Sequence, residues 1–342
     1  MRRFVLAAVL SCCVAGPPPA VAQDAELSIL PKVPVDYQPA RTPWGEPDLR
    51  GSWPIDHLNG TPLQRDPKQG DRVFLTDEEF AQRARFIEGA AKRYEVEDQE
   101  NKIGMGHWAE MGEVSRRTSF IVDPPNGRLP ELTAEGKRLS AAMRSSWRKG
   151  QVFDWVTDFD SWDRCITRGM PASMFPFQYN NGIRIFQAPG VVAINMEMVH
   201  ETRIIPTDGR PGIPSKVRHW LGESRGRWEN GNTLVVETTN LRPGASATNV
   251  GTIGSPPEND MPISEQARIV ERFTMTAPDR IVYEMTYADP VVFAAPWTAR
   301  LDWKRDGKYE MFEYACHEGN VQVRNYISAS RAERAQKSGG SQ

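Results

Sequence analysis

The sequence predicts a mainly β protein, in which an antiparallel meander forms a barrel or a barrel-like sandwich. Two observations support this prediction. From about residue 180 onward, apolar and polar residues alternate with period two over several successive segments. Short turn signals separate some of these segments, which is typical of consecutive hairpins.

The N-terminus reads as a signal peptide over residues 1–22. Arg2 and Arg3 precede an apolar run over residues 4–16, which is too short to span a bilayer, and residues 20–22 form a small-residue cleavage site. A twin-arginine signal, or lipid attachment at Cys12, are alternatives. We therefore expect a periplasmic or secreted protein.

Without residues 1–22, 320 residues remain, with 40 basic residues (42 less Arg2 and Arg3) against 44 acidic ones. This net charge of −4 gives no reason to expect nucleic acid as a partner. No later segment has the apolar length of a transmembrane helix. A small molecule is the expected partner.

Residues 23–70 are rich in proline and turn residues and predict an extended arm. Residues 71–179 predict helices and loops that pack on the β domain. Thr76 and Glu79 match a capping box before apolar residues at helical spacing, and a second helix is expected to begin near Thr133.

Residues 180–334 predict the antiparallel β domain, with a disordered tail over 335–342. The expected strands are "GIRIFQ", "VVAINMEMVH", "NTLVVETT", "ARIVERFTMT", "RIVYEMTY", "ARLDWKR" and "YEMFEYA". The turns are expected at Asn230-Gly231, at residues 277–279 and at Asp306-Gly307. Seven or more such strands favour closure into a lipocalin-like barrel, or folding into a sandwich. A long Gly/Pro-rich loop spans residues 243–262.

Strand parity predicts which side chains face the core. The odd-numbered residues are the apolar ones in residues 267–275, 281–287 and 299–303. Glu271 interrupts its apolar row, so its carboxylate must be paired, as with an arginine, or have a raised pKa. In the last predicted strand, Cys316 lies on the apolar face and His317 on the opposite one.

Cys165 and Cys316 are the only cysteines outside the signal peptide. Two cysteines in an oxidising compartment usually pair, so we expect a disulfide between them.

No motif predicts a metal or a cofactor. The five histidines form no zinc spacing, and no calcium loop or dinucleotide fingerprint is present. The stretch at residues 222–226 matches G-x-S-x-G as letters, but it precedes a hairpin rather than a helix, so a nucleophile is disfavoured.

Acid–base chemistry remains open. The plausible proton carriers are His200, His317, Glu318, Glu271 and Asp289, because histidine titrates near neutral pH and burial raises the pKa of carboxyls. We expect Arg203, with Asn180 or Asn181, to bind an oxyanion or a hydroxyl group. Asp289-Pro290 and residues 180–182 are also ordinary turn sequences.

The stretches "RTPWGEPDLRGSW", "RCITRGMP", "YNNG", "MVHETRIIPTDGRP", "WLGESRGRWENGNTLVVETTN" and "YEYACHEGN" resemble a widespread, largely uncharacterised family of secreted bacterial proteins. The resemblance covers most of residues 41–334, with Asp163 where the family usually has glutamate. It implies no established reaction. The following residues belong to the family pattern: Arg164, Cys165, Asn180, Asn181, His200, Arg203, Trp220, Cys316, His317 and Glu318. Among these, Trp220 and Arg164 are added to the expected ligand-binding residues.

Three functions are compatible with these features. The first is a periplasmic, cofactor-independent lyase, isomerase or hydrolase that acts on a small apolar or aromatic molecule in a barrel pocket. The second is a non-catalytic binding protein of lipocalin type. The third is an envelope structural or interaction protein, in which the ten tryptophans only fill the core.

Overall fold

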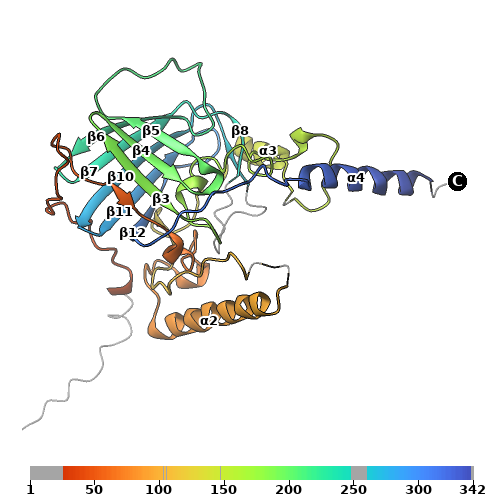
Figure 1. Cartoon of the computed structure of the whole chain (residues 1–342), viewed down its shortest axis with the longest axis horizontal. Helices are drawn as coiled ribbons and strands as arrows, with labels where there is room; N and C mark the ends of the chain where they lie inside the picture. Colours follow the sequence, from red (N-terminus) through yellow and green to blue (C-terminus); the bar gives the residue numbers. More distant parts are fainter. Residues whose placement is uncertain (1–25, 103, 105, 147, 248–259, 340–342) are drawn as a thin grey trace, which may run out of the picture.

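Two antiparallel sheets form the centre of the protein (Figure 1). The computed structural model describes residues 26–102, 104, 106–146, 148–247 and 260–339. The larger sheet has the order β2 (Ile121–Asp123), β12 (Trp297–Lys304), β11 (Arg280–Ala288), β10 (Arg268–Ala277), β7 (Thr233–Thr239) and β6 (Glu223–Glu229). The smaller sheet has the order β1 (Gly51–Ser52), β3 (Ile183–Ala188), β4 (Val191–Met196) and β5 (Thr202–Pro206).

The prediction of a mainly β, antiparallel protein is confirmed, and the arrangement is sandwich-like. Among the described strands, the ladders do not close into a barrel. β5 and β6 lie near each other, but they belong to different sheets and form no hydrogen-bonded ladder. The inner faces of the two sheets meet in one apolar core.

The predicted inward rows are confirmed for the central strands. Phe273 on β10 lies opposite Tyr283 on β11, which in turn lies opposite Leu301 on β12, and all three are buried. The other inward residues of these strands are also buried: Ile269, Met275, Ile281, Met285, Tyr287, Trp297, Ala299 and Trp303. The alternation succeeds here because one face of each strand packs on the core.

Two of the predicted turns join hairpins. Asn230 and Gly231 have φ of 53° and 74°, as a type I′ turn between β6 and β7 requires. Residues 277–279 connect β10 to β11, with a register shift at Met275/Ala277. The third turn is different, because the segment after Asp306-Gly307 forms no strand.

The segment "YEMFEYA", residues 309–315, was the main error among the expected strands. It runs as extended chain outside the sheets, and residues 316–319 form turns. The aromatic residues of this segment do not form one buried row, since the Phe312 side chain is 69% exposed and Tyr314 is half-buried. Helix α4 (Gln322–Gly339) follows and extends away from the sheets, so residues 335–339 are helical rather than a disordered tail (Figure 1).

The N-terminal region contributes to both sheets. β1, within the predicted arm, pairs with β3, and β2 pairs with β12. These strands are two and three residues long, which explains why periodicity did not reveal them. Short 3-10 helices lie between the main elements: Asp56–Leu58, Pro67–Gln69, Val156–Asp158, Ala172–Met174 and Met198–His200.

Both predicted helix starts are confirmed. Helix α2 (Asp77–Gln99) begins with the Thr76 and Glu79 capping box, and helix α3 (Ala134–Ala142) begins after Thr133, whose side chain accepts from the Gly136 N–H. Helix α2 buries no residue completely and lies to one side of the sheets (Figure 1).

The predicted Cys165–Cys316 disulfide is present and joins residues 151 positions apart. Such a bond fits an oxidising compartment. Within the described residues, no helix has the length and apolarity needed to cross a bilayer. The predicted signal peptide and most of the 243–262 loop lie outside the described residues. The two ends of that loop pair as β8 (Gly244–Ala247) and β9 (Asp260–Ile263).

Candidate functional site

The structure brings Asn180 and Asn181 together with two glutamates. The Asn180 N–H donates to Glu110 Oε1 (2.9 Å), and Asn181 Nδ2 donates to Glu110 Oε2 (2.7 Å). Asn180 Nδ2 donates to Glu197 Oε1 (2.9 Å). Asn180 adopts a left-handed φ of 53°, which asparagine tolerates better than most residues. The two amides therefore hold carboxyl groups that come from different parts of the chain.

Tyr309 bridges the same two glutamates. Its hydroxyl oxygen lies 2.9 Å from Glu110 Oε1 and 2.9 Å from Glu197 Oε2. The Gly182 N–H (2.9 Å) and the Phe312 N–H (2.8 Å) also donate to Glu197. A Cβ at residue 182 would lie 2.5 Å from Glu197 Oε2, so glycine permits this close approach. We call Glu110, Glu197, Tyr309, Asn180 and Asn181 the carboxyl–tyrosine cluster.

The Tyr309 hydroxyl carries one hydrogen, yet it lies within hydrogen-bond distance of two carboxyl oxygens. It can donate to only one of them. The second short oxygen–oxygen approach is satisfied when one glutamate is protonated and donates to the hydroxyl oxygen. Like charges this close also disfavour double ionisation.

Glu110 is the better candidate to hold this proton. Burial raises the pKa of the Glu110 carboxyl, and the nearby Glu197 raises it further, while hydrogen bonds from Asn181 and Tyr309 oppose the shift without reversing it. Burial, together with Glu110 and Glu197, also raises the pKa of Tyr309, so its hydroxyl stays protonated.

Glu110 also lines a cavity of about 240 Å³ against helix α2. Its apolar wall includes Phe86, Ile87 and Met111. Asn59 lines it too and donates to the Glu110 carbonyl oxygen (2.8 Å), whereas its own Oδ1 is buried with no hydrogen-bond partner within the described residues. We call this space the α2 cavity. Glu110 is thus the residue that the cavity shares with the carboxyl–tyrosine cluster.

Tyr309→Phe tests the shared proton. We expect a loss of about 1–2 kcal/mol in the free energy of unfolding, because the two carboxyls lose their bridging donor. We also expect a stronger infrared band of protonated carboxyl at pH 7, because the hydrogen bond from Tyr309 that opposes the raised pKa of Glu110 is lost. The unmodified protein and the Tyr309→Phe variant should both carry Glu201→Gln in this experiment. Burial raises the pKa of Glu201 to about 7, so its own protonated carboxyl would contribute to the band.

Tyr326→Phe on α4 is the matched control and should leave the infrared band unchanged. An unchanged band in Tyr309→Phe would show that the Tyr309 hydroxyl does not influence the protonation of Glu110.

Arg203 and Glu271 form a buried ion pair between β5 and β10. Arg203 Nη1 donates to Glu271 Oε1 (2.8 Å), and the Tyr283 hydroxyl donates to the same oxygen (2.8 Å). Arg203 Nη2 also contacts Ser224 Oγ and Thr238 Oγ1, each at 3.1 Å. This pairing with arginine is what the interrupted apolar row predicted, and it commits Glu271 to the core rather than to a proton-transfer site.

Asp289 also has a local role. Its carboxylate accepts from the Ser264 N–H (2.8 Å), from Ser264 Oγ (2.6 Å) and from the Val291 N–H (3.2 Å). It is buried, and these bonds fix the turn after β11. The turn interpretation therefore accounts for Asp289.

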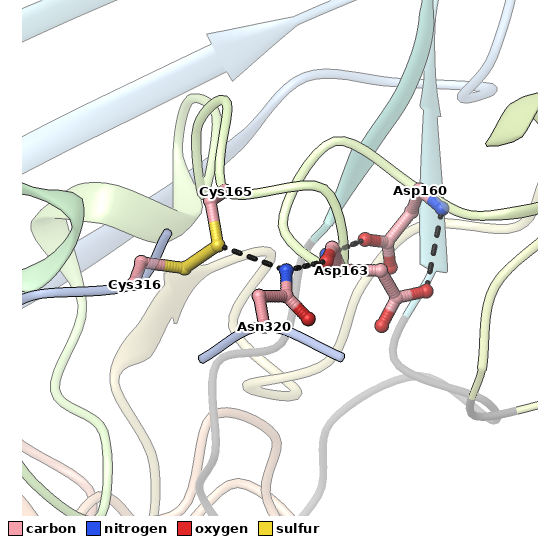
Figure 2. The surroundings of a disulfide bond; sticks show 5 residues. All are labelled: Asp160, Asp163, Cys165, Cys316 and Asn320. Atoms are coloured by element: carbon pink, nitrogen blue, oxygen red, sulfur yellow. Dashed lines mark hydrogen bonds between the residues drawn. A yellow bond between two sulfur atoms is a disulfide. The ribbon is translucent and has the colours of Figure 1, made fainter. Parts of the chain in front are cut away.

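His200, His317 and Glu318 are all exposed. His200 lies in the connection between β4 and β5 with a left-handed φ of 46°. Glu318 lines a cavity beside the disulfide. Figure 2 shows the surroundings of the disulfide, where Asn320 Nδ2 lies 3.1 Å from the Asp163 carbonyl oxygen and 3.2 Å from Cys165 Sγ. Neither histidine lines the α2 cavity. Trp220 and Arg164 line another cavity, described below.

Sequence reasoning missed Glu110, Tyr309 and Glu201. Glu110 lies in no recognisable motif, and Tyr309 was assigned to a strand. Glu201 follows His200, and burial raises its pKa to about 7 against hydrogen bonds from Thr167 and the Arg168 backbone. The position of Glu201 directly after His200 is the feature of the sequence that could have pointed to it.

Glu201→Gln should change the pH dependence of stability. Between pH 4.5 and about 7 the unfolded state releases the Glu201 proton while the folded state keeps it. Rising pH therefore favours unfolding, and stability falls across this window. Urea denaturation should show that the free energy of unfolding falls across this pH window by roughly 1–3 kcal/mol less in Glu201→Gln than in the unmodified protein. Equal slopes in both proteins would contradict the raised pKa; Glu95→Gln on the exposed side of α2 is the control.

Comparisons with known proteins add no assignment. No family model, no curated protein and no solved structure matches this chain. Within the described residues, no group of three or more His, Cys, Asp or Glu side chains is placed to hold a metal ion. The candidate site must therefore be judged from its own geometry.

Proposed function

We propose that the protein is a cofactor-independent acid–base enzyme that acts on a small apolar or aromatic molecule in the α2 cavity. The observation that carries this proposal is the Tyr309 hydroxyl between two carboxyl groups, one of which, Glu110, lines that cavity. A carboxyl whose pKa is raised by burial is better suited to act as a general acid than an exposed one. The reaction class is lyase, isomerase or hydrolase.

The cavity walls support the substrate class. Phe86, Ile87 and Met111 offer apolar surface, which favours an alkyl or aromatic body. A protonated Glu110 favours a carbonyl or hydroxyl oxygen on the ligand. The proposed substrate is thus small and mainly apolar, with an oxygen function. A periplasmic or extracellular location belongs to the same proposal.

The cluster also supports proton return. Once Glu110 has donated its proton, two carboxylates face one hydroxyl, and their repulsion favours uptake of a new proton. Tyr309 keeps its position through Glu197, which the Gly182 and Phe312 backbone groups hold. Asn180 and Asn181 orient Glu110 through three bonds, so they are positioning residues.

Non-catalytic binding in the same cavity is the second candidate. It is favoured by the fact that both Glu110 oxygens already accept hydrogen bonds within the cluster. In that case Glu110 would stiffen the cavity wall and transfer no proton.

Deuterium incorporation at carbon separates the two candidates. Acetophenone, phenylacetone and cyclohexanone are incubated with the protein in D2O, and exchange next to the carbonyl is followed by NMR, with binding measured by saturation transfer. A general acid at Glu110 should accelerate exchange, and Glu110→Gln should reduce that acceleration about a hundredfold.

Glu95→Gln, which removes a carboxyl from the exposed side of α2, should exchange as fast as the unmodified protein. Binding without accelerated exchange would favour the non-catalytic candidate. Neither binding nor exchange by any of the ketones would reject the α2 cavity as the site.

A further inference from the structure

A second cavity, of about 640 Å³, lies between helix α3, the segment before Cys165 and the loop that carries Trp220. It is separate from the α2 cavity, with which it shares no lining residue. Leu139, Met143, Phe159 and Ile263 give it apolar surface. We call it the Trp220 cavity. Its volume falls in the range of small-molecule sites.

The two carboxylates on its lining already have arginine partners. Arg138 Nε donates to Glu135 Oε2 (2.8 Å), and Arg218 Nη2 lies 3.1 Å from Glu265 Oε2. Neither partner arginine lines the cavity itself. The negative charge of the lining is thus largely balanced from outside.

Two of its three arginines have no such balance. Arg144 pairs with Asp158 (2.9 Å). Arg164 donates through Nε to the Asp160 carbonyl oxygen (3.0 Å), and Arg242 lies over the Trp220 ring at 4.6 Å. Within the described residues, no carboxylate pairs with Arg164 or Arg242. The guanidinium groups of Arg164 and Arg242 can therefore bind an anion beside an apolar surface.

The Arg242–Trp220 contact favours a planar anion. The Arg242 guanidinium lies over the Trp220 ring, and a guanidinium can donate two parallel hydrogen bonds to a carboxylate. Inorganic phosphate would satisfy the charge but would leave the apolar surface of Phe159 and Met143 unused.

We propose that the Trp220 cavity is a second ligand site, which binds an organic carboxylate with an apolar or aromatic body. Arg164 and Arg242 bind the carboxylate, and Leu139, Met143, Phe159 and Ile263 contact the apolar body. The site is independent of the proposed chemistry at Glu110.

Calorimetric titration with 4-phenylbutyrate tests the site, and 4-phenylbutanol is its uncharged counterpart. The carboxylate should bind saturably and about tenfold or more tightly than the alcohol. Arg242→Gln and Arg164→Gln should each weaken carboxylate binding about tenfold and leave alcohol binding nearly unchanged. Because Arg242 is exposed, its variant should fold even if Arg164→Gln does not.

Arg227→Gln is the matched control, since it removes the same charge from an exposed pair with Glu229 on β6. It should bind 4-phenylbutyrate as the unmodified protein does. Glu110→Gln should also leave this affinity unchanged, which separates the result from the proposed enzyme. Equal affinity for acid and alcohol, equal losses in Arg242→Gln and Arg227→Gln, or no saturable binding would each overturn the proposal.

Discussion

Replacing Arg203 with methionine is expected to lower the free energy of unfolding by about 3–5 kcal/mol. The Arg203 and Glu271 side chains are 1% and 0% exposed, and they link the two sheets. Without the guanidinium, the Glu271 carboxylate stays in the core, and among the described residues only the Tyr283 hydroxyl remains as a donor. An unpaired buried charge costs far more than the same pair gains. Urea denaturation followed by tryptophan fluorescence measures the loss.

A second substitution identifies the cause. Arg203→Met with Glu271→Gln removes the charge but keeps an acceptor for Tyr283, so it should recover more than half of the loss. Arg268→Met removes an arginine from an exposed pair with Glu237 on the same sheet and should cost at most about 1 kcal/mol. If the double variant is as unstable as Arg203→Met, lost packing and not the unpaired carboxylate explains the effect.

Removing the disulfide by Cys165→Ala with Cys316→Ala is expected to cost about 4–5 kcal/mol. The bond closes a loop of 151 positions, and a cross-link over so long a loop strongly restricts the unfolded chain. It also anchors the extended segment before α4, which joins no sheet. Guanidinium denaturation of the oxidised protein and of the variant measures the difference.

The unmodified protein in excess reductant should unfold at the same denaturant concentration as the double alanine variant. Both should show a larger dependence of stability on denaturant than the oxidised protein, because the unfolded chain without its cross-link exposes more surface. A midpoint unchanged by reduction would show that the bond contributes no stability.

Part of the candidate site lies at residues that the sequence singles out. Asn180 and Asn181 are expected ligand-binding residues, whereas their glutamate and tyrosine partners stand in no motif. Glu110 and Tyr309 lie 199 positions apart and meet through one hydroxyl group. No periodicity or spacing links positions so far apart, since their proximity depends on the path of two irregular segments across the sheets.

Local physics explains what the sequence by itself determined: the β class, the inward rows of residues 267–303, both helix caps and the pairing of two lone cysteines. Each depends on neighbours in the chain, on alternation or on a count. The tertiary structure alone decided that Glu271 meets Arg203, that Glu110 shares a hydroxyl with Glu197, and that Trp220 and Arg164 line one cavity. Those contacts depend on how the two sheets and the irregular segments pack, because polar side chains find their partners across space.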